Sequence, residues 1–85
     1  MKKLRKDIEE LVEMKKAWYR REIGLRALLK REKQIKQRIY DAGQRSLKRE
    51  TELQEQGKWE KAEKLMYEWL EVVGFFEECY LNYRG

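Results

Sequence analysis

Apolar residues are concentrated in one stretch near the C-terminus, from Trp59 to Tyr83. One series within it recurs at steps of three and four: Ala62, Leu65, Met66, Trp69, Val72, Val73, Phe76, Cys79, Tyr80 and Tyr83. That period marks one face of an α-helix. Four further apolar residues fall off this face: Tyr67, Leu70, Phe75 and Leu81. A helix that is apolar around most of its circumference needs cover on more than one side, from the rest of the chain or from a second copy.

The first half of the chain carries a heptad-like pattern. Residues 2–40 contain Gly24 as their only helix breaker. The series along this stretch is Leu4, Leu11, Trp18, Leu25, Glu32 and Ile39, with Met14, Leu28, Ile35 and Ala42 three residues after members of it. The pattern predicts one helix over 2–40, whose seam must face a partner because so long a helix is not stable alone.

The clearest break in the pattern is at 41–45, where Gly43 suits the left-handed position after a helix end. Ser46 would then cap a return helix over 46–83. Gly57 marks a second candidate break in that helix. Two arrangements remain open: a long antiparallel helical hairpin, favoured by the nearly equal halves, and a three-helix unit over 2–40, 46–56 and 59–84.

Either arrangement predicts an all-α fold in one domain over 1–85, dimerising into a helical bundle. With 85 residues, 44% of them charged, the chain is near the lower size limit for a stable core. The lone Cys79 excludes an internal disulfide, so oligomerisation is the remaining means of stabilisation. The residues expected at the oligomer interface are Trp59, Met66, Trp69, Leu70, Val73, Phe75, Phe76 and Tyr80.

The run from Gly57 to Leu65, Gly-Lys-Trp-Glu-Lys-Ala-Glu-Lys-Leu, resembles the inter-helix turn of a tetratricopeptide repeat. The similarity covers roughly residues 50–70, in a single copy. Trp69 stands where the repeat has a small residue. Since repeats of this kind need neighbours, the resemblance implies a helical hairpin and not a solenoid.

The net charge of +5 is unevenly distributed. Residues 15–49 contain 13 Lys and Arg against 3 Asp and Glu, whereas residues 51–85 contain 4 against 8. Such a basic block indicates an acidic partner: nucleic acid, a membrane surface, an acidic protein or the acidic half of another copy. The residues expected to contact it are Lys15, Lys16, Arg20, Arg21, Arg26, Lys30, Arg31, Lys33 and Lys36. Tyr19 and Tyr40 lie among these cations, off the seam, and are candidates for stacking on unpaired bases.

These observations predict a small, basic, non-enzymatic binding module. The favoured function is a nucleic-acid-binding accessory or regulatory protein that contacts phosphates through residues 15–49. The alternative is a protein-binding adaptor, inhibitor or assembly factor that uses helix faces on an acidic or apolar partner.

Several other classes are disfavoured by the sequence. Without His or any Gly-rich phosphate loop, no catalytic constellation is visible, and we expect no metal and no cofactor. The longest charge-free apolar run, 72–76, is far too short to span a membrane. One thiol and no recognisable signal peptide indicate a cytoplasmic protein.

Overall fold

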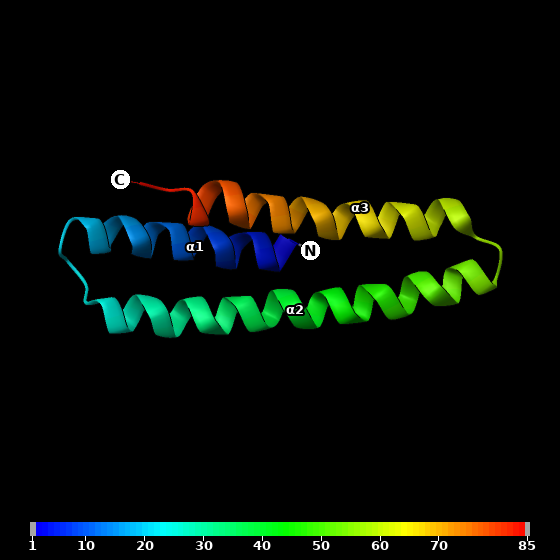
Figure 1. Cartoon of the computed structure of the whole chain (residues 1–85), viewed down its shortest axis with the longest axis horizontal. Coiled ribbons are helices and arrows are strands. Elements are labelled where there is room, and N and C mark those ends of the chain that lie inside the picture. Colours follow the sequence, from blue (N-terminus) through cyan, green and yellow to red (C-terminus); the bar gives the residue numbers. More distant parts are fainter. Residues whose placement is uncertain (1, 85) are drawn as a thin grey trace.

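The computed structural model describes residues 2–84, and within them the chain is all helical, as predicted. Helix α1 spans Lys2–Tyr19, α2 spans Leu25–Glu55 and α3 spans Trp59–Phe76. A π-helical turn over Glu77–Leu81 follows α3 directly. The molecule is a rod of 52 × 19 × 16 Å, whose length is set by α2 (Figure 1).

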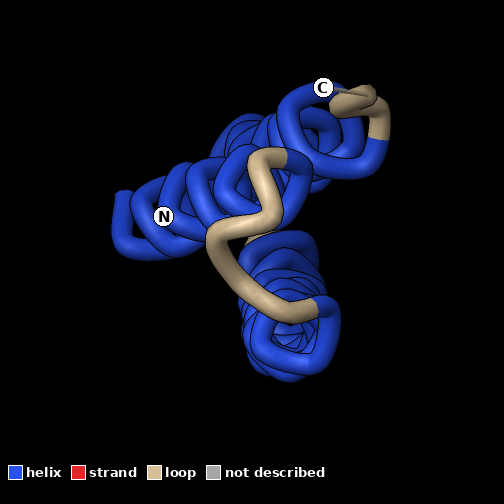
Figure 2. Tube along the Cα trace, turned by 90° about the vertical axis from the view of Figure 1, so that its left-hand side faces the viewer, coloured by secondary structure: helices blue, strands red, loops and turns tan. Residues whose placement is uncertain are grey.

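The three helices differ in length, so different parts of α2 pack against α1 and against α3. α3 and the π-helical turn run antiparallel to α2 but stop short of the first turns of α2, whereas the shorter α1 lies beside only the first half of α2 (Figure 1). Seen from the end, the helices form a triangle (Figure 2). The part of the rod where α1 and α3 overlap is therefore a three-helix bundle, and the end near the α2–α3 turn is an arm made of α2 and α3 alone.

The hydrophobic core lies in the three-helix part. Ile8 and Leu11 of α1 and Ile35 of α2 are fully buried. The rest of this core is contributed by α2, α3 and the π-helical turn: Leu28, Ile39, Val72, Phe76 and Tyr80. In the arm, two buried apolar side chains, Leu53 and Ala62, hold α2 and α3 together.

The predicted single helix over 2–40 is wrong, because the chain turns at residues 20–24. Arg21 adopts a left-handed conformation with φ +62°. The amide of Arg21 donates to the carbonyl of Trp18 at 2.9 Å, and that of Glu22 donates to Ala17 at 2.9 Å. This pair of bonds is a Schellman motif, which terminates α1 and satisfies its last carbonyls. The motif normally has Gly at the left-handed position, so an arginine at position 21 does not predict a helix end there.

The predicted break at 41–45 is also wrong, since these residues lie inside α2. Gly43 is small for a packing reason: a Cβ there would lie 2.7 Å from Cζ2 of the Trp69 side chain. Ser46 is likewise a buried residue within α2 and not a helix cap. The break at Gly57 is real, with φ +76° and the same Schellman bonds, from Gly57 to Gln54 and from Lys58 to Leu53.

The structure thus has three helices, but with bounds that differ from the predicted three-helix unit. The favoured two-helix hairpin of 2–40 with 46–83 does not form, because the turn at Arg21 folds α1 back onto α2. Dimerisation stays a prediction.

Candidate binding surfaces

Two arginines of α2 hold α1 in place through carboxylates. Asp7, only 8% exposed, receives Arg38 at 2.8 Å and lies 3.7 Å from Arg31. Arg31 also pairs with Glu10 at 3.2 Å. A carboxylate this buried needs such partners, because an isolated buried charge is strongly unfavourable. Arg31 therefore forms ion pairs within the chain, although the sequence predicted that it contacts a partner.

Four more of the nine predicted contact residues are also engaged inside the chain. Lys15 donates to the main-chain carbonyl of Tyr80, and its ammonium lies 4.7 Å from the centre of that ring. Lys16 pairs with Glu13, Arg20 with Glu22, and Lys36 with Glu32. The exposed pairs among these are weak and can exchange partners. Lys15 is the exception, because an ordered carbonyl and an aromatic face both hold it.

The other four, Arg21, Arg26, Lys30 and Lys33, have no carboxylate partner among residues 2–84. Three of them are spaced by four and three residues, so they share one face of α2. Arg26 and Lys30 each stand two residues from the buried Leu28, and a separation of two residues is about 200° around a helix. These side chains therefore point away from the core.

The same outer face continues along α2 with polar and aromatic residues. Gln37 and Gln44 follow at the same spacing, and between them Tyr40 is 61% exposed. We call Arg26, Lys30, Lys33, Gln37 and Tyr40 the outer stripe. It combines cations, amides and one aromatic ring, which is the set of groups that proteins use on nucleic-acid backbones and unpaired bases.

A small polar cluster closes the core near the end of α3. The Tyr80 hydroxyl, in a side chain only 3% exposed, donates to Glu32 at 2.8 Å. Burial and this carboxylate raise the pKa of Tyr80. Burial works to raise the pKa of Glu32, but hydrogen bonds from Lys36 and Tyr80 outweigh it and lower that pKa. Burial, with Arg84, lowers the pKa of Lys15. The cluster is structural, because each group is paired with a neighbour.

The predicted interface residues divide into two groups. Phe76 and Tyr80 are buried within one chain, where their rings stack with centroids 5.3 Å apart, so they are not available to a second copy. Trp69, Val73 and Phe75 are half-buried against the same core. The exposed members are Trp59, Met66 and Leu70.

The exposed members share one side of the rod with apolar residues of α2. Arg38 of α2 and Phe75 of α3 both contact α1, through Asp7 and Arg5. Residues two positions from such contacts lie about 200° away, on the opposite side. Tyr40 and Leu47 of α2 follow Arg38 and Arg45 in this way, and Val73 of α3 precedes Phe75.

Met66 and Leu70 share the face of Val73, being seven and three residues before it, and Trp59 lies a further heptad back. We call Tyr40, Leu47, Trp59, Met66 and Leu70 the open face. Sequence reasoning missed its α2 half, although the heptad spacing from Lys33 through Tyr40 to Leu47 was visible. An exposed apolar surface of this kind is typical of a protein contact.

No known protein family, curated protein or solved structure matches the chain. Among the helices of residues 2–84, none is long and apolar enough to cross a membrane.

Proposed function

We propose that this protein binds nucleic acid without catalysis, through the outer stripe of α2. The observation that supports this most is the alignment of Arg26, Lys30 and Lys33, which have no carboxylate partner among residues 2–84. Like charges at such spacing destabilise a helix by a few tenths of a kcal/mol per pair, so an acidic partner would relieve them. Arg21 adds a fourth cation in the preceding turn.

Binding of this type acts mainly on phosphates and has little sequence preference. Three or four phosphates neutralised by these cations give a log–log salt slope of about −3 to −4 on duplex DNA. Tyr40, at the end of the stripe, adds a ring on which an unpaired base can stack, worth about 1–3 kcal/mol. Single strands should therefore bind at least as well as duplexes of equal charge.

The test compares two variants that lose the same charge. Arg26→Gln with Lys30→Gln and Lys33→Gln removes the cations of the outer stripe. Lys16→Gln with Arg20→Gln and Lys36→Gln removes cations that the chain already pairs. The salt dependence of binding to unrelated oligonucleotides is measured by fluorescence anisotropy. We expect the first variant to abolish binding and the second to weaken it modestly. Equal losses, or no binding by the native protein at about 50 mM salt, would refute the proposal.

We further propose that two copies pair through the open face. Charge complementarity favours one arrangement: α2 has 9 Lys and Arg against 5 acidic residues, whereas residues 59–81 have 2 against 6. A two-fold dimer that sets α2 of one copy against α3 of the other brings opposite charges together beside the apolar contacts. Arg26 and Lys30 stay accessible in that dimer, because they point to the outer side of α2. Tyr40 belongs to both surfaces, so it can stack on a base only in the unpaired chain.

Met66→Glu places a charge on the open face, and Tyr67→Glu places one on the neighbouring, outward-facing position of α3. Both native side chains are exposed in one chain, so neither change should disturb its core. Light scattering at micromolar concentration should show a dimer for the native protein and for Tyr67→Glu, and a monomer for Met66→Glu. A monomeric native protein would refute the proposed dimer.

The same exposed apolar residues favour a second candidate function. If the native protein is monomeric, the open face is free for another protein, and the chain acts as an adaptor, inhibitor or assembly factor. Capture of one stoichiometric protein partner that is lost in Met66→Glu, from preparations free of nucleic acid, distinguishes this function from the first.

A further inference from the structure

The side of α2 that receives α1 carries arginines at heptad spacing, Arg31, Arg38 and Arg45. The first two are used by α1, whose Asp7 and Glu10 bind them. The third lies beyond the N-terminal end of α1, in the arm, and has no carboxylate partner among residues 2–84. The pattern of α2 that holds α1 thus continues for longer than α1 does.

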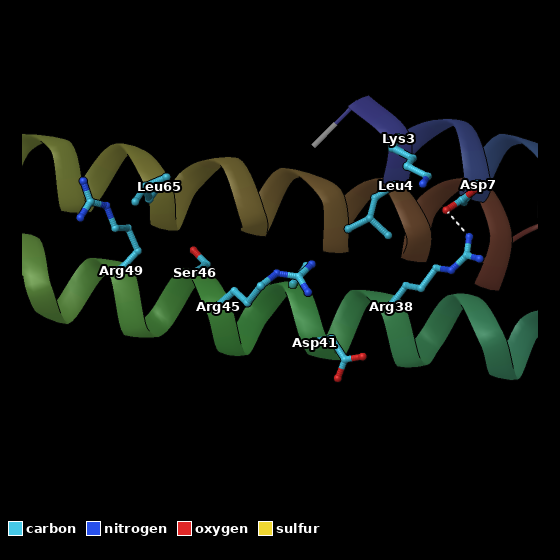
Figure 3. A pocket seen from close by; sticks show the side chains of 10 residues that line it. Lys3, Leu4, Asp7, Arg38, Asp41, Arg45, Ser46, Arg49 and Leu65 are labelled. Carbon is cyan, nitrogen blue, oxygen red and sulfur yellow. Dashed lines mark hydrogen bonds and ion pairs between the residues drawn. The ribbon is translucent and has the colours of Figure 1, made fainter.

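A groove occupies this uncovered part. Its volume is about 520 Å³, within the range of ligand sites, and it lies between α2 and α3 where α1 ends (Figure 3). Four cations line it, Lys3, Arg38, Arg45 and Arg49. Its two carboxylates already have partners within the chain, since Asp7 pairs with Arg38 and Asp41 accepts from Gln37. Figure 3 shows Arg45 extending along the groove toward Leu4, and Arg49 reaching toward Leu65 on α3. The only contact of Arg49 with an acid in residues 2–84 is a long one of 3.4 Å to the exposed Glu52.

Small residues line the groove on α2. Ala42 and Ser46 are one helical turn apart and are both small, so they leave room for a third helix over the groove. Ser46 is 8% exposed, and its hydroxyl is buried without a hydrogen-bond partner among the described residues. An unpaired buried hydroxyl is unfavourable, and Figure 3 shows this one directed toward α3.

We propose that this groove binds an acidic amphipathic helix of a partner protein, placed end to end with α1. Helix α1 already binds α2 in the same way. It lies on the same side of α2, its apolar residues face inward, and its carboxylates pair with arginines of α2. The new helix would set carboxylates against Arg45 and Arg49. From Arg45 to the end of α2 at Glu55 the arm has room for about three turns.

This site is separate from both the outer stripe and the open face. Tyr40 and Leu47 follow Arg38 and Arg45 by two residues, so they lie on the opposite side of α2. Lys48 also points away from the groove and does not line it. Loss of nucleic-acid binding or of dimerisation therefore leaves this inference standing, and it can fail while they hold.

The experiment uses the full chain and a fluorescent synthetic helical peptide of about three turns, with leucines on one face and glutamates along its edges. A matched peptide has glutamine in place of every glutamate. We expect the acidic peptide to bind in low salt and the glutamine peptide to bind at least tenfold more weakly. Arg45→Gln with Arg49→Gln should also weaken binding at least tenfold, whereas Lys48→Gln should change it less than twofold.

A second variant checks the shape of the site. Ser46→Leu fills the groove and should abolish peptide binding, while circular dichroism confirms that the helices remain. Equal binding of both peptides, or equal losses of peptide affinity in the Arg45→Gln with Arg49→Gln and the Lys48→Gln proteins, would overturn the proposal. It would also be overturned if a short oligonucleotide displaced the peptide and the binding of that oligonucleotide depended on Arg45. The last result would assign the groove to nucleic acid.

Discussion

Gly43 offers a sharp test of how α2 and α3 pack. It lies in the middle of α2, where glycine is about 1 kcal/mol less favourable than alanine. By helix propensity alone, Gly43→Ala should stabilise the protein. The Trp69 side chain opposes this, because a Cβ at Gly43 would lie 2.7 Å from Cζ2 and 2.8 Å from Cε2 of the indole. Contacts under 3.0 Å force the ring or the helix to move.

The magnitude follows from what the movement would disrupt. Overpacking a well-fitted site costs about 1–3 kcal/mol. The indole Nε1 also donates to the carbonyl of Ile39 at 3.2 Å, and loss of that bond costs about 0.5–1.5 kcal/mol. After subtraction of the gain in propensity, we expect Gly43→Ala to lower the free energy of unfolding by about 1–3 kcal/mol.

Urea unfolding followed by circular dichroism at one fixed protein concentration measures the effect. The control is the same substitution in a Trp69→Leu background, where the indole is absent. There Gly43→Ala should stabilise, by up to about 1 kcal/mol, so the sign of the effect reverses between the two backgrounds. Stabilisation in the native background, or the same sign in both, would refute the packing role of Gly43.

Three further predictions concern the turn, the ion pair and the core tyrosine. Arg21→Gly should raise the free energy of unfolding by about 0.5–1 kcal/mol, because φ +62° is strained for arginine; a loss of stability would contradict the left-handed turn. Asp7→Asn should lower it by about 2–3 kcal/mol, somewhat less than for a fully buried pair, while the exposed Glu10→Gln should change it by under about 0.5 kcal/mol. The pKa of Tyr80 is raised above the 10.0 of a free tyrosine, so its contribution to stability is complete below pH 10 and declines as the pH rises above it. Above pH 10, the thermal stability of Tyr80→Phe should therefore fall less with rising pH than that of the native protein. Thermal melts at several pH values measure this, and parallel curves of stability against pH would contradict it.

The sequence determined the fold class and the residues that pack. Period-three-and-four spacing places Leu11, Leu28 and Ile35 on inward faces, and all three are buried. The turn at Gly57 was also visible, because a left-handed residue at a helix end is usually glycine. These features are local, so a few neighbouring residues are enough to specify them.

Only the tertiary structure decided where the first helix ends and which cations are free. Arg21 carries no local signal for a left-handed turn, and Gly43 is small because of Trp69, which is 26 residues away. Arg31 resembles Lys30 and Lys33 in sequence, yet its guanidinium is used by Asp7 and Glu10 of α1. The space beside Trp69 and the pairing of Arg31 depend on contacts between distant segments. Periodicity along one helix shows which face a residue occupies. It does not show which residue of a distant segment packs against that face in the folded chain.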